Sequence, residues 1–261
     1  LRNPLGSPFT LGISNAAAFG AAFSVMVLGT GSMQSTGADA ISVTSPYLTT
    51  ISAFTACLLA AGVILVIARI RRSSPEVMIL TGVALGSLFT AGTMFLQYFA
   101  DDVQLAAIVF WTFGDLGRAS WRELLIISSM TVLASSYFMM NRWSYNAIDA
   151  GDETAGSLGV PVERKRLAGM LVASLVTATV ISFVGVIGFV GLVGPHMVRR
   201  ILGDDHRFLI PGSMLAGGLL LLAADTVART MLAPRVLPVA VLTAFVGAPV
   251  FVLLLVRGYR R

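Results

Sequence analysis

The sequence lacks the residues from which many metalloproteins, disulfide-linked proteins and hydrolases are built. Its 261 residues include one cysteine, Cys57, and two histidines, His196 and His206. No disulfide can form within the chain, and no spacing of His, Cys or carboxylate indicates a zinc or iron site. No Ser/His/Asp arrangement is recognisable. We therefore expect no cofactor, no resident metal and no covalent catalysis.

A phosphate-binding loop is missing as well. The pattern G-x-x-x-x-G-K-[ST] does not occur, and the only lysine, Lys165, follows no glycine-rich loop. In proteins that use this loop, its backbone N–H groups and its lysine hold the nucleotide phosphates. The chain alone therefore cannot be the ATPase of a pump, so any ATP-driven role would depend on a partner.

Charged residues are scarce, whereas hydrophobic residues abound. Charged residues make up 12% of the chain and hydrophobic residues 56%, while a soluble domain usually carries about 25% charged residues. The apolar residues come in blocks of about 20, the length with which a helix crosses a bilayer. Such blocks predict transmembrane helices in a lipid bilayer and argue against the buried core of a soluble protein.

Eight segments are expected to span the membrane, so the predicted fold class is an all-α, polytopic transmembrane helical bundle. We treat residues 1–261 as a single domain. A further apolar stretch, 105–113, is too short to span and is expected to lie at the surface or to dip into it. The predicted spans are 11–28, 47–70, 77–99, 124–140, 167–187, 189–202, 209–232 and 239–256.

The basic residues lie in short loops between the apolar blocks and do not gather on one soluble face. This distribution argues against nucleic-acid binding, despite a pI near 10.0, and follows the rule that cytoplasmic loops carry the excess of Lys and Arg. If the loop at Arg69 is cytoplasmic, 14 of the 18 basic residues fall inside. The four outside are Arg118, Arg122, Arg229 and Arg235.

Glycines recur at places where helices could approach closely. Gly82 and Gly86 form a pair of small residues one helical turn apart, and Gly185, Gly188, Gly191 and Gly194 recur every third residue. Small residues let helix backbones come close together in lipid. The second run is also compatible with a sharp chain reversal inside the protein, where non-helical backbone is tolerated away from lipid.

Asp225 is the ionisable residue that lies away from the span ends. A carboxylate inside a membrane is costly and suggests a function, and Arg229 follows four residues later on the same helix face. Three interpretations are open. The pair can be a structural ion pair near the outer helix end, or Asp225 can orient Arg229 towards an acidic partner outside. A proton relay is disfavoured because no second buried carboxylate or histidine accompanies Asp225.

The longest informative loop is 141–166. Asp152 and Glu153 suit the positive N-terminal end of a short helix, Gly159 suits its C-terminal stop, and Pro161 suits the start of a second short helix. The loop is either an ordinary solvated loop or a rigid two-helix knob that another protein grips.

Several segments follow one another in a characteristic order. They are 2–14 (RNPLGSPFTLGIS), 80–86 (LTGVALG), 152–159 (DETAGSLG), 188–199 (GFVGLVGPHMVR), 205–207 (DHR), 221–229 (LLAADTVAR) and 237–251. In these segments the chain resembles the permease subunits of ABC importers for iron–siderophores, haem and cobalamin. The resemblance runs from Arg2 to about Arg257, and its specificity lies in the order and spacing of the segments together.

The resemblance implies a ten-helix subunit of the bacterial cytoplasmic (inner) membrane. The eight predicted spans would be its third to tenth helices, so we expect the N-terminal part of a longer protein to be missing. Two permease subunits, identical or different, would enclose a pore. Each would bind a cytoplasmic ATP-binding subunit, and an extracytoplasmic substrate-binding protein would deliver the chelate.

The resemblance also implies roles for particular residues. Arg229, held by Asp225, would meet an acidic residue of the binding protein. The segment that couples to the ATPase would comprise Asp152, Glu153, Ala155, Gly156, Leu158 and Gly159. The residues near the cytoplasmic gate would be Asn3, Leu5, Ser74 and Pro75.

An ATP-driven importer of an iron–siderophore-type chelate is the favoured function, because that role is common in the family. Haem and cobalamin remain open as substrates. The rivals from other classes are an ion-coupled secondary carrier and a membrane scaffold that transports nothing.

Overall fold

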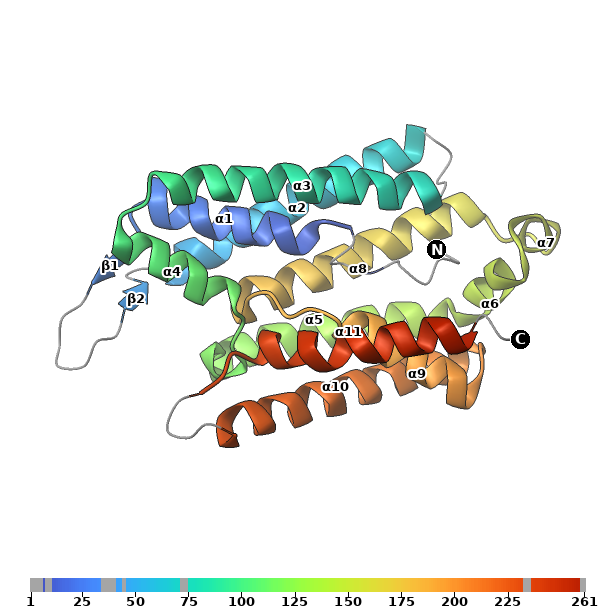
Figure 1. Ribbon diagram of the computed structural model, residues 1–261. Coiled ribbons are helices and arrows are strands. Elements are labelled where there is room, and N and C mark those ends of the chain that lie inside the picture. Colours follow the sequence, from blue (N-terminus) through green and yellow to red (C-terminus); the bar gives the residue numbers. More distant parts are fainter. Residues whose placement is uncertain are drawn as a thin grey trace.

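The structure, a computed structural model, describes residue 7 and residues 11–33, 41–43, 46–70, 75–231 and 236–258. Over these residues the chain folds into a bundle of helices, most of which run roughly parallel or antiparallel to one another (Figure 1). The helices are α1 Ile13–Val27, α2 Pro46–Ile70, α3 Pro75–Tyr98, α4 Asp102–Thr112, α5 Trp121–Met140, α6 Arg142–Ala150, α7 Asp152–Ser157, α8 Val162–Val184, α9 Val190–Leu202, α10 His206–Thr230 and α11 Val239–Gly258, with a short 3₁₀ helix, η1, at Leu116–Arg118.

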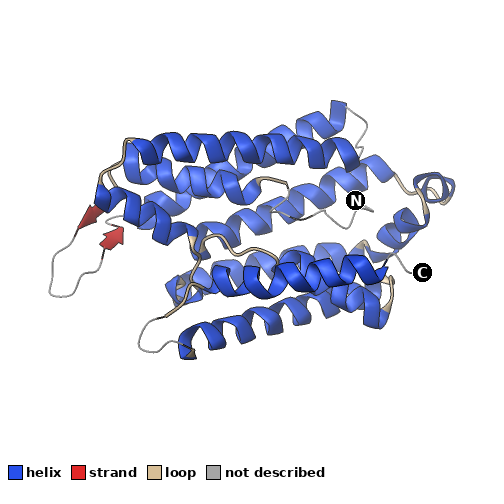
Figure 2. Cartoon of the chain, in the orientation of Figure 1, coloured by secondary structure: helices blue, strands red, loops and turns tan. Residues whose placement is uncertain are grey.

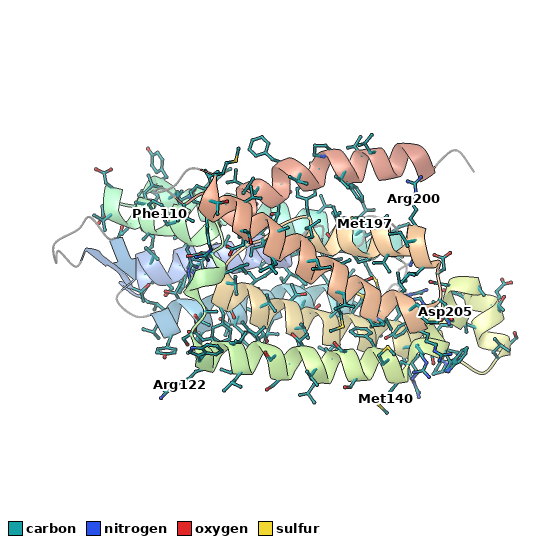
Figure 3. The ribbon with its side chains drawn as sticks, turned by 90° about the horizontal axis from the view of Figure 1, so that it is seen from below. Phe110, Arg122, Met140, Met197, Arg200 and Asp205 are labelled. Atoms are coloured by element: carbon teal, nitrogen blue, oxygen red, sulfur yellow. The ribbon has the colours of Figure 1, made fainter. Side chains whose placement is uncertain are left out.

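The two ends of the bundle differ. At one end lie α7, the end of α5 and the starts of α8 and α10, which we call the α7 end; at the other lie α4 and a β-ribbon, the ribbon end (Figure 1). Arg200 and Asp205 lie at the α7 end, whereas Arg122 lies at the ribbon end (Figure 3). Arg200 and Arg122, which the charge pattern assigned to opposite sides of the membrane, thus lie at opposite ends of the bundle.

Five of the described helices are long and apolar enough to cross a membrane: α2, α3, α5, α8 and α10. The multi-pass membrane bundle is thereby supported, but the count of eight full spans is not reproduced. Helix α1 has 15 residues and α9 has 13, which at 1.5 Å per residue gives about 22 Å and about 20 Å. Both are shorter than a hydrocarbon core of about 30 Å.

The predicted span 167–187 is present as α8, Val162–Val184, whereas 189–202 needs correction. Helix α8 ends at Val184, and the chain then runs back in an extended stretch, 185–189, before α9 begins (Figure 2). Gly185 has φ +83°, and a Cβ atom there would lie 2.8 Å from the carbonyl oxygen of Trp111. Segment 189–202 is therefore a half-length helix. The sequence pattern allowed this reversal as an alternative to helix packing.

One half of the bundle consists of α1, α2, α3, α4 and α8. Helix α1 lies at its centre and packs against the other four. A Cβ atom on Gly12 would lie 2.6 Å from the carbonyl oxygen of Gly82 and 2.8 Å from the nitrogen of Gly86. The predicted close approach at Gly82 and Gly86 is thus confirmed. The amide of Asn15 joins the same two helices by donating to the carbonyl of Gly86 at 3.1 Å.

The remaining helices form a second half. Helix α9 packs against α10 and α11, and α5 joins the two halves by packing against both α8 and α10. The all-α prediction has one exception among the described residues. Residues 31–33 pair in antiparallel register with 41–43, so that Ser32 faces Ser42. This short ribbon lies outside the predicted spans, where no helical periodicity was expected.

The packing of α1 on α2 generates a test. A Cβ atom on Gly20 would meet the carbonyl oxygen of Ser52 and would lie 2.8 Å from the Cα of Ala53, whereas Gly62 of α2 has open space around it. We expect Gly20→Ala to lower the free energy of unfolding by about 1–3 kcal/mol because it overpacks a tight contact. Gly62→Ala is the matched control and is expected to change it little. Denaturant unfolding in detergent measures both; equal stability of the two variants would contradict the packing.

Candidate functional site

The predicted coupling segment is a short, exposed helix. Helix α7 starts at Asp152 with Glu153 beside it, as the sequence predicted. It stops at Gly159, which has φ +77°, and the N–H of Val160 closes the turn by donating to the carbonyl of Ala155 at 2.9 Å. Pro161 begins a helix as predicted, but that helix is the 23-residue α8 and not a short one.

Most of α7 faces away from the protein, as its position beyond the bundle shows (Figure 1). Ala155 is its buried residue. Leu158 is 68% exposed, and a Cβ atom on Gly156 would meet nothing within 4 Å. The segment therefore presents a small apolar tip flanked by carboxylates, which is a surface suited to contact with another protein.

The base of α7 is tied to α8. Nη2 of Arg166 lies 2.9 Å and 3.1 Å from the two carboxylate oxygens of Asp152, and the Arg166 side chain is only 8% exposed. Hydrogen bonds between charged groups are among the stronger ones in proteins. The ammonium group of Lys165 also donates to the side-chain oxygen of Asn141, which stands between α5 and α6. Asp152 therefore has an internal partner, while Glu153 does not show one among the described contacts.

A second tie joins α6 to the start of α10. The side-chain amide of Asn146 donates to Oδ1 of Asp205 at 2.9 Å and accepts from the backbone N–H of His206 at 2.9 Å. The N–H of Arg207 and the amide of Asn146 hold the pKa of the Asp205 carboxyl below its ordinary value. Sequence reasoning missed Asn146; the only signal for this contact was the 205–207 segment, about 60 residues away.

At the ribbon end, the predicted ion pair is present. Nε of Arg229 lies 2.7 Å from Oδ2 of Asp225, which is 17% exposed, while Arg229 is 46% exposed. Nη2 of Arg229 also lies 3.9 Å from Oδ1 of Asp115, in the loop between α4 and α5. Sequence reasoning did not single out Asp115. Asp225 thus holds one edge of the guanidinium, the other edge lies towards Asp115 and Gly117, and the side chain as a whole stays partly exposed.

The predicted gate residues can be located only in part. Asn3, Leu5 and Ser74 lie outside the described residues, and Pro75 is the first residue of α3.

A groove of about 470 Å³ runs between α1 and α3, where Asn15, Ser87 and Thr90 supply polar atoms. A second cavity, of about 240 Å³, lies between the start of α1 and helices α5, α6 and α8.

The chain matches a known family of transport proteins along almost its whole length. A model of the FecCD transport family matches residues 1–257. The chain is 58% identical, over its whole length and 74% of the relative, to a Methanocaldococcus jannaschii protein named as an ABC transporter permease. It is 35% identical to the hemin transport system permease protein of Yersinia pestis, over 98% of this chain and 74% of that protein.

The likeness extends to further permeases and to a solved structure. Identity to the cobalamin import system permease protein of Halobacterium salinarum is 36%, over 97% of this chain and 64% of that protein. A solved structure described as an inward-facing conformation of a metal-chelate type ABC transporter has a TM-score of 0.85 and 29% identity. It covers 98% of this chain and 77% of the other. The residues that the family model matches, 1–257, include α7 and Arg229.

Proposed function

Since this chain belongs to the FecCD transport family, we propose that it is the membrane-spanning subunit of an ATP-driven importer for an iron–siderophore-type metal chelate. An ABC importer permease of this family is not itself an enzyme, because ATP is normally hydrolysed by a partner. The observation that carries the proposal is the family match over residues 1–257, which includes the exposed helix α7.

Two likenesses support the choice of an iron chelate, the first for a metal chelate in general and the second for iron. One is the structure of the metal-chelate type transporter. The other is the Fe(3+)-citrate import system permease protein of Bacillus subtilis, 32% identical over 98% of this chain. Haem or cobalamin is the second candidate, because the hemin and cobalamin permeases, at 35% and 36% identity, are more similar to this chain than the Fe(3+)-citrate permease at 32%.

In the proposed mechanism, ATP binding and hydrolysis act on this chain through α7. Two permease subunits enclose the pathway, and the ATP-binding subunit of each holds α7. A change of shape in that partner favours one access state of the pore over the other, which is a population shift driven by differential affinity. At the opposite end, a substrate-binding protein docks near Arg229 and delivers the chelate. The chain itself breaks and forms no covalent bond.

The proposed contact with the ATPase can be tested at the tip of α7. Glu153→Arg combined with Gly156→Trp changes the charge and shape of an exposed surface. The fold should be unaffected, because position 156 has open space. We expect association with the ATP-binding subunit and uptake to fall to about a tenth or less, as for the loss of a hot spot in an interface.

The matched control for this test is Glu163→Arg, which reverses an exposed acidic residue in the first turn of α8. Co-purification and uptake into vesicles measure both variants. Association and uptake as high as in the unmodified protein would refute the coupling role of α7.

The proposed docking role of Arg229 predicts a charge effect. Arg229→Glu is expected to weaken capture of the substrate-binding protein about tenfold at low salt, because an exposed interfacial pair acts mainly through association rate and salt sensitivity. Partial rescue is expected from a reversed charge on the partner. Arg122→Glu, exposed at the same end (Figure 3), is the control. Undiminished capture that does not depend on salt would leave the pair with a structural role only.

Substrate and energy source can be tested together in vesicles that contain the whole transporter. We expect uptake of ferric siderophores to exceed that of haem and cobalamin, and to stop when ATP hydrolysis by the partner is abolished. Preferred uptake of haem or cobalamin would show that the substrate is not a ferric siderophore. Uptake that survives without hydrolysis but collapses with a proton ionophore would favour an ion-coupled carrier instead.

A further inference from the structure

The contact between α6 and α10 is more specific than the packing of two helices requires. One side chain, Asn146, uses both its donor and its acceptor. Its Nδ2 donates to Oδ1 of Asp205 at 2.9 Å. Its Oδ1 accepts the backbone N–H of His206 at 2.9 Å, and Nδ1 of the His206 ring lies 2.8 Å from the same oxygen. Three polar contacts thus fix Asn146 to the first residues of α10.

Asp205 is also the residue that caps α10. Its Oδ1 accepts the N–H of Arg207 at 2.9 Å, and α10 begins directly after it. An N-cap side chain sets where a helix starts by satisfying one of its free N–H groups. Because Asn146 shares the capping oxygen, a displacement of α6 acts directly on the start of α10.

A second polar residue, Asp149, lies one turn further along α6 and faces the same turn. Oδ2 of Asp149 lies 3.9 Å from Nδ1 of His206 and 4.0 Å from Nη2 of Arg199, in the last turn of α9. Nε of Arg199 in turn lies 3.3 Å from Oδ1 of Asp204. Oδ2 of Asp149 forms no hydrogen bond among the described residues, so its charge faces both sides of the turn that joins α9 to α10, while the hydrogen bonds of Asn146 hold α6 there.

The contact lies where α6 and α7 touch both halves of the bundle. Helices α6 and α7 are consecutive and pack on each other. From this unit, Asp152 reaches α8, which belongs to the half built around α1 and α2. Asn146 reaches α10, which belongs with α9 and α11 to the other half. A movement of α7 would thus be transmitted to both halves at once.

We propose that Asn146 is a positioning residue that carries the displacement of α7 to α9 and α10. This inference rests on the proposed function, because it assumes that an ATP-binding subunit moves α7. Helix α9 continues at its other end into the extended stretch 185–189, where Phe189 has φ +65°. There a Cβ atom on Gly247 of α11 would lie 2.5 Å from the Cβ of Phe189. A shift of α9 therefore acts on non-helical backbone inside the bundle.

The test measures coupling in the complete transporter, reconstituted in vesicles with its ATP-binding subunit and substrate-binding protein. The readout is the number of ferric siderophore molecules imported for each ATP hydrolysed. We expect Asn146→Ala to lower this ratio about fivefold while the ATP-binding subunit still associates, in the range seen for residues that link two sites. Ser144→Ala, on the same helix, is the control and is expected to keep the ratio unchanged.

A reciprocal exchange separates transmission from simple destabilisation. Asn146→Asp alone places two carboxylates side by side and is expected to lower the ratio at least as much as Asn146→Ala. Combining it with Asp205→Asn restores a donor and an acceptor across the contact, with their positions exchanged. The double variant is expected to recover at least half of the lost coupling. If the two substitutions only damaged the fold, their losses would add and the double variant would have a lower ratio than either single variant.

The outcomes distinguish this inference from the proposed function. If the unmodified complex imports substrate and Asn146→Ala keeps its ratio, the inference is overturned and the proposed function stands. The inference is likewise overturned if Asn146→Ala lowers only thermal stability. If no ATP-binding subunit associates with the unmodified chain, the proposed function fails, and the inference is overturned with it.

Discussion

The hydrocarbon core of a membrane offers a polypeptide no hydrogen-bond partners, and the arrangement of this protein follows from that constraint. Long α-helices satisfy their own backbone groups, so α2, α3, α5, α8 and α10 can stand beside lipid. The extended stretch 185–189 cannot do so, and it occurs where other parts of the chain approach it closely. The N–H of Asp115 donates to the carbonyl of Val184 at 2.8 Å, at the end of α8. Gly114 and Gly185 allow the two segments to meet there.

Charge is confined to the ends of the bundle by the same constraint, yet the two ends use it differently. At the α7 end, Arg166 is almost fully buried and its partner Asp152 is half exposed, so the pair anchors a helix. At the ribbon end, Arg229 is the more exposed partner and Asp225 the more buried one. Removing one member of a buried charged pair is strongly destabilising, so the first pair suits a structural role. The partly buried carboxylate of Asp225 orients the guanidinium of Arg229, whose side chain is nearly half exposed.

The two halves of the bundle meet through few elements, and this gives the α6–α7 unit its importance. Helix α5 packs on α8 and α10, and α6 connects to α10 through polar side chains. Packed interiors are dense and transmit displacement. The hydrogen bonds of the Asn146 side-chain amide also fix how α6 is oriented relative to the start of α10. A partner that moves α7 would therefore reach the α8 half through Asp152 and the α10 half through Asn146. The proposed transport cycle needs such a link, because the proposed ATPase contact, α7, lies at one end of the bundle (Figure 1).

Several features were determined by the sequence alone because their physical causes are local. The apolar blocks and the charge asymmetry predicted a multi-pass helical bundle, and the residues around α7 predicted its start and its stop at Gly159. The spacing of Asp225 and Arg229 predicted their pairing, since residues four apart share a helix face.

Only the tertiary structure decided the features that depend on distant residues. The half-length of α9 arises where 185–189 meets Gly114 and Phe189 packs beside Gly247. The contact of Asn146 with Asp205 and His206 joins residues about 60 positions apart. Periodicity and capping signals describe neighbours along the chain, and they carry no information about which distant backbone or side chain will be close enough to bond.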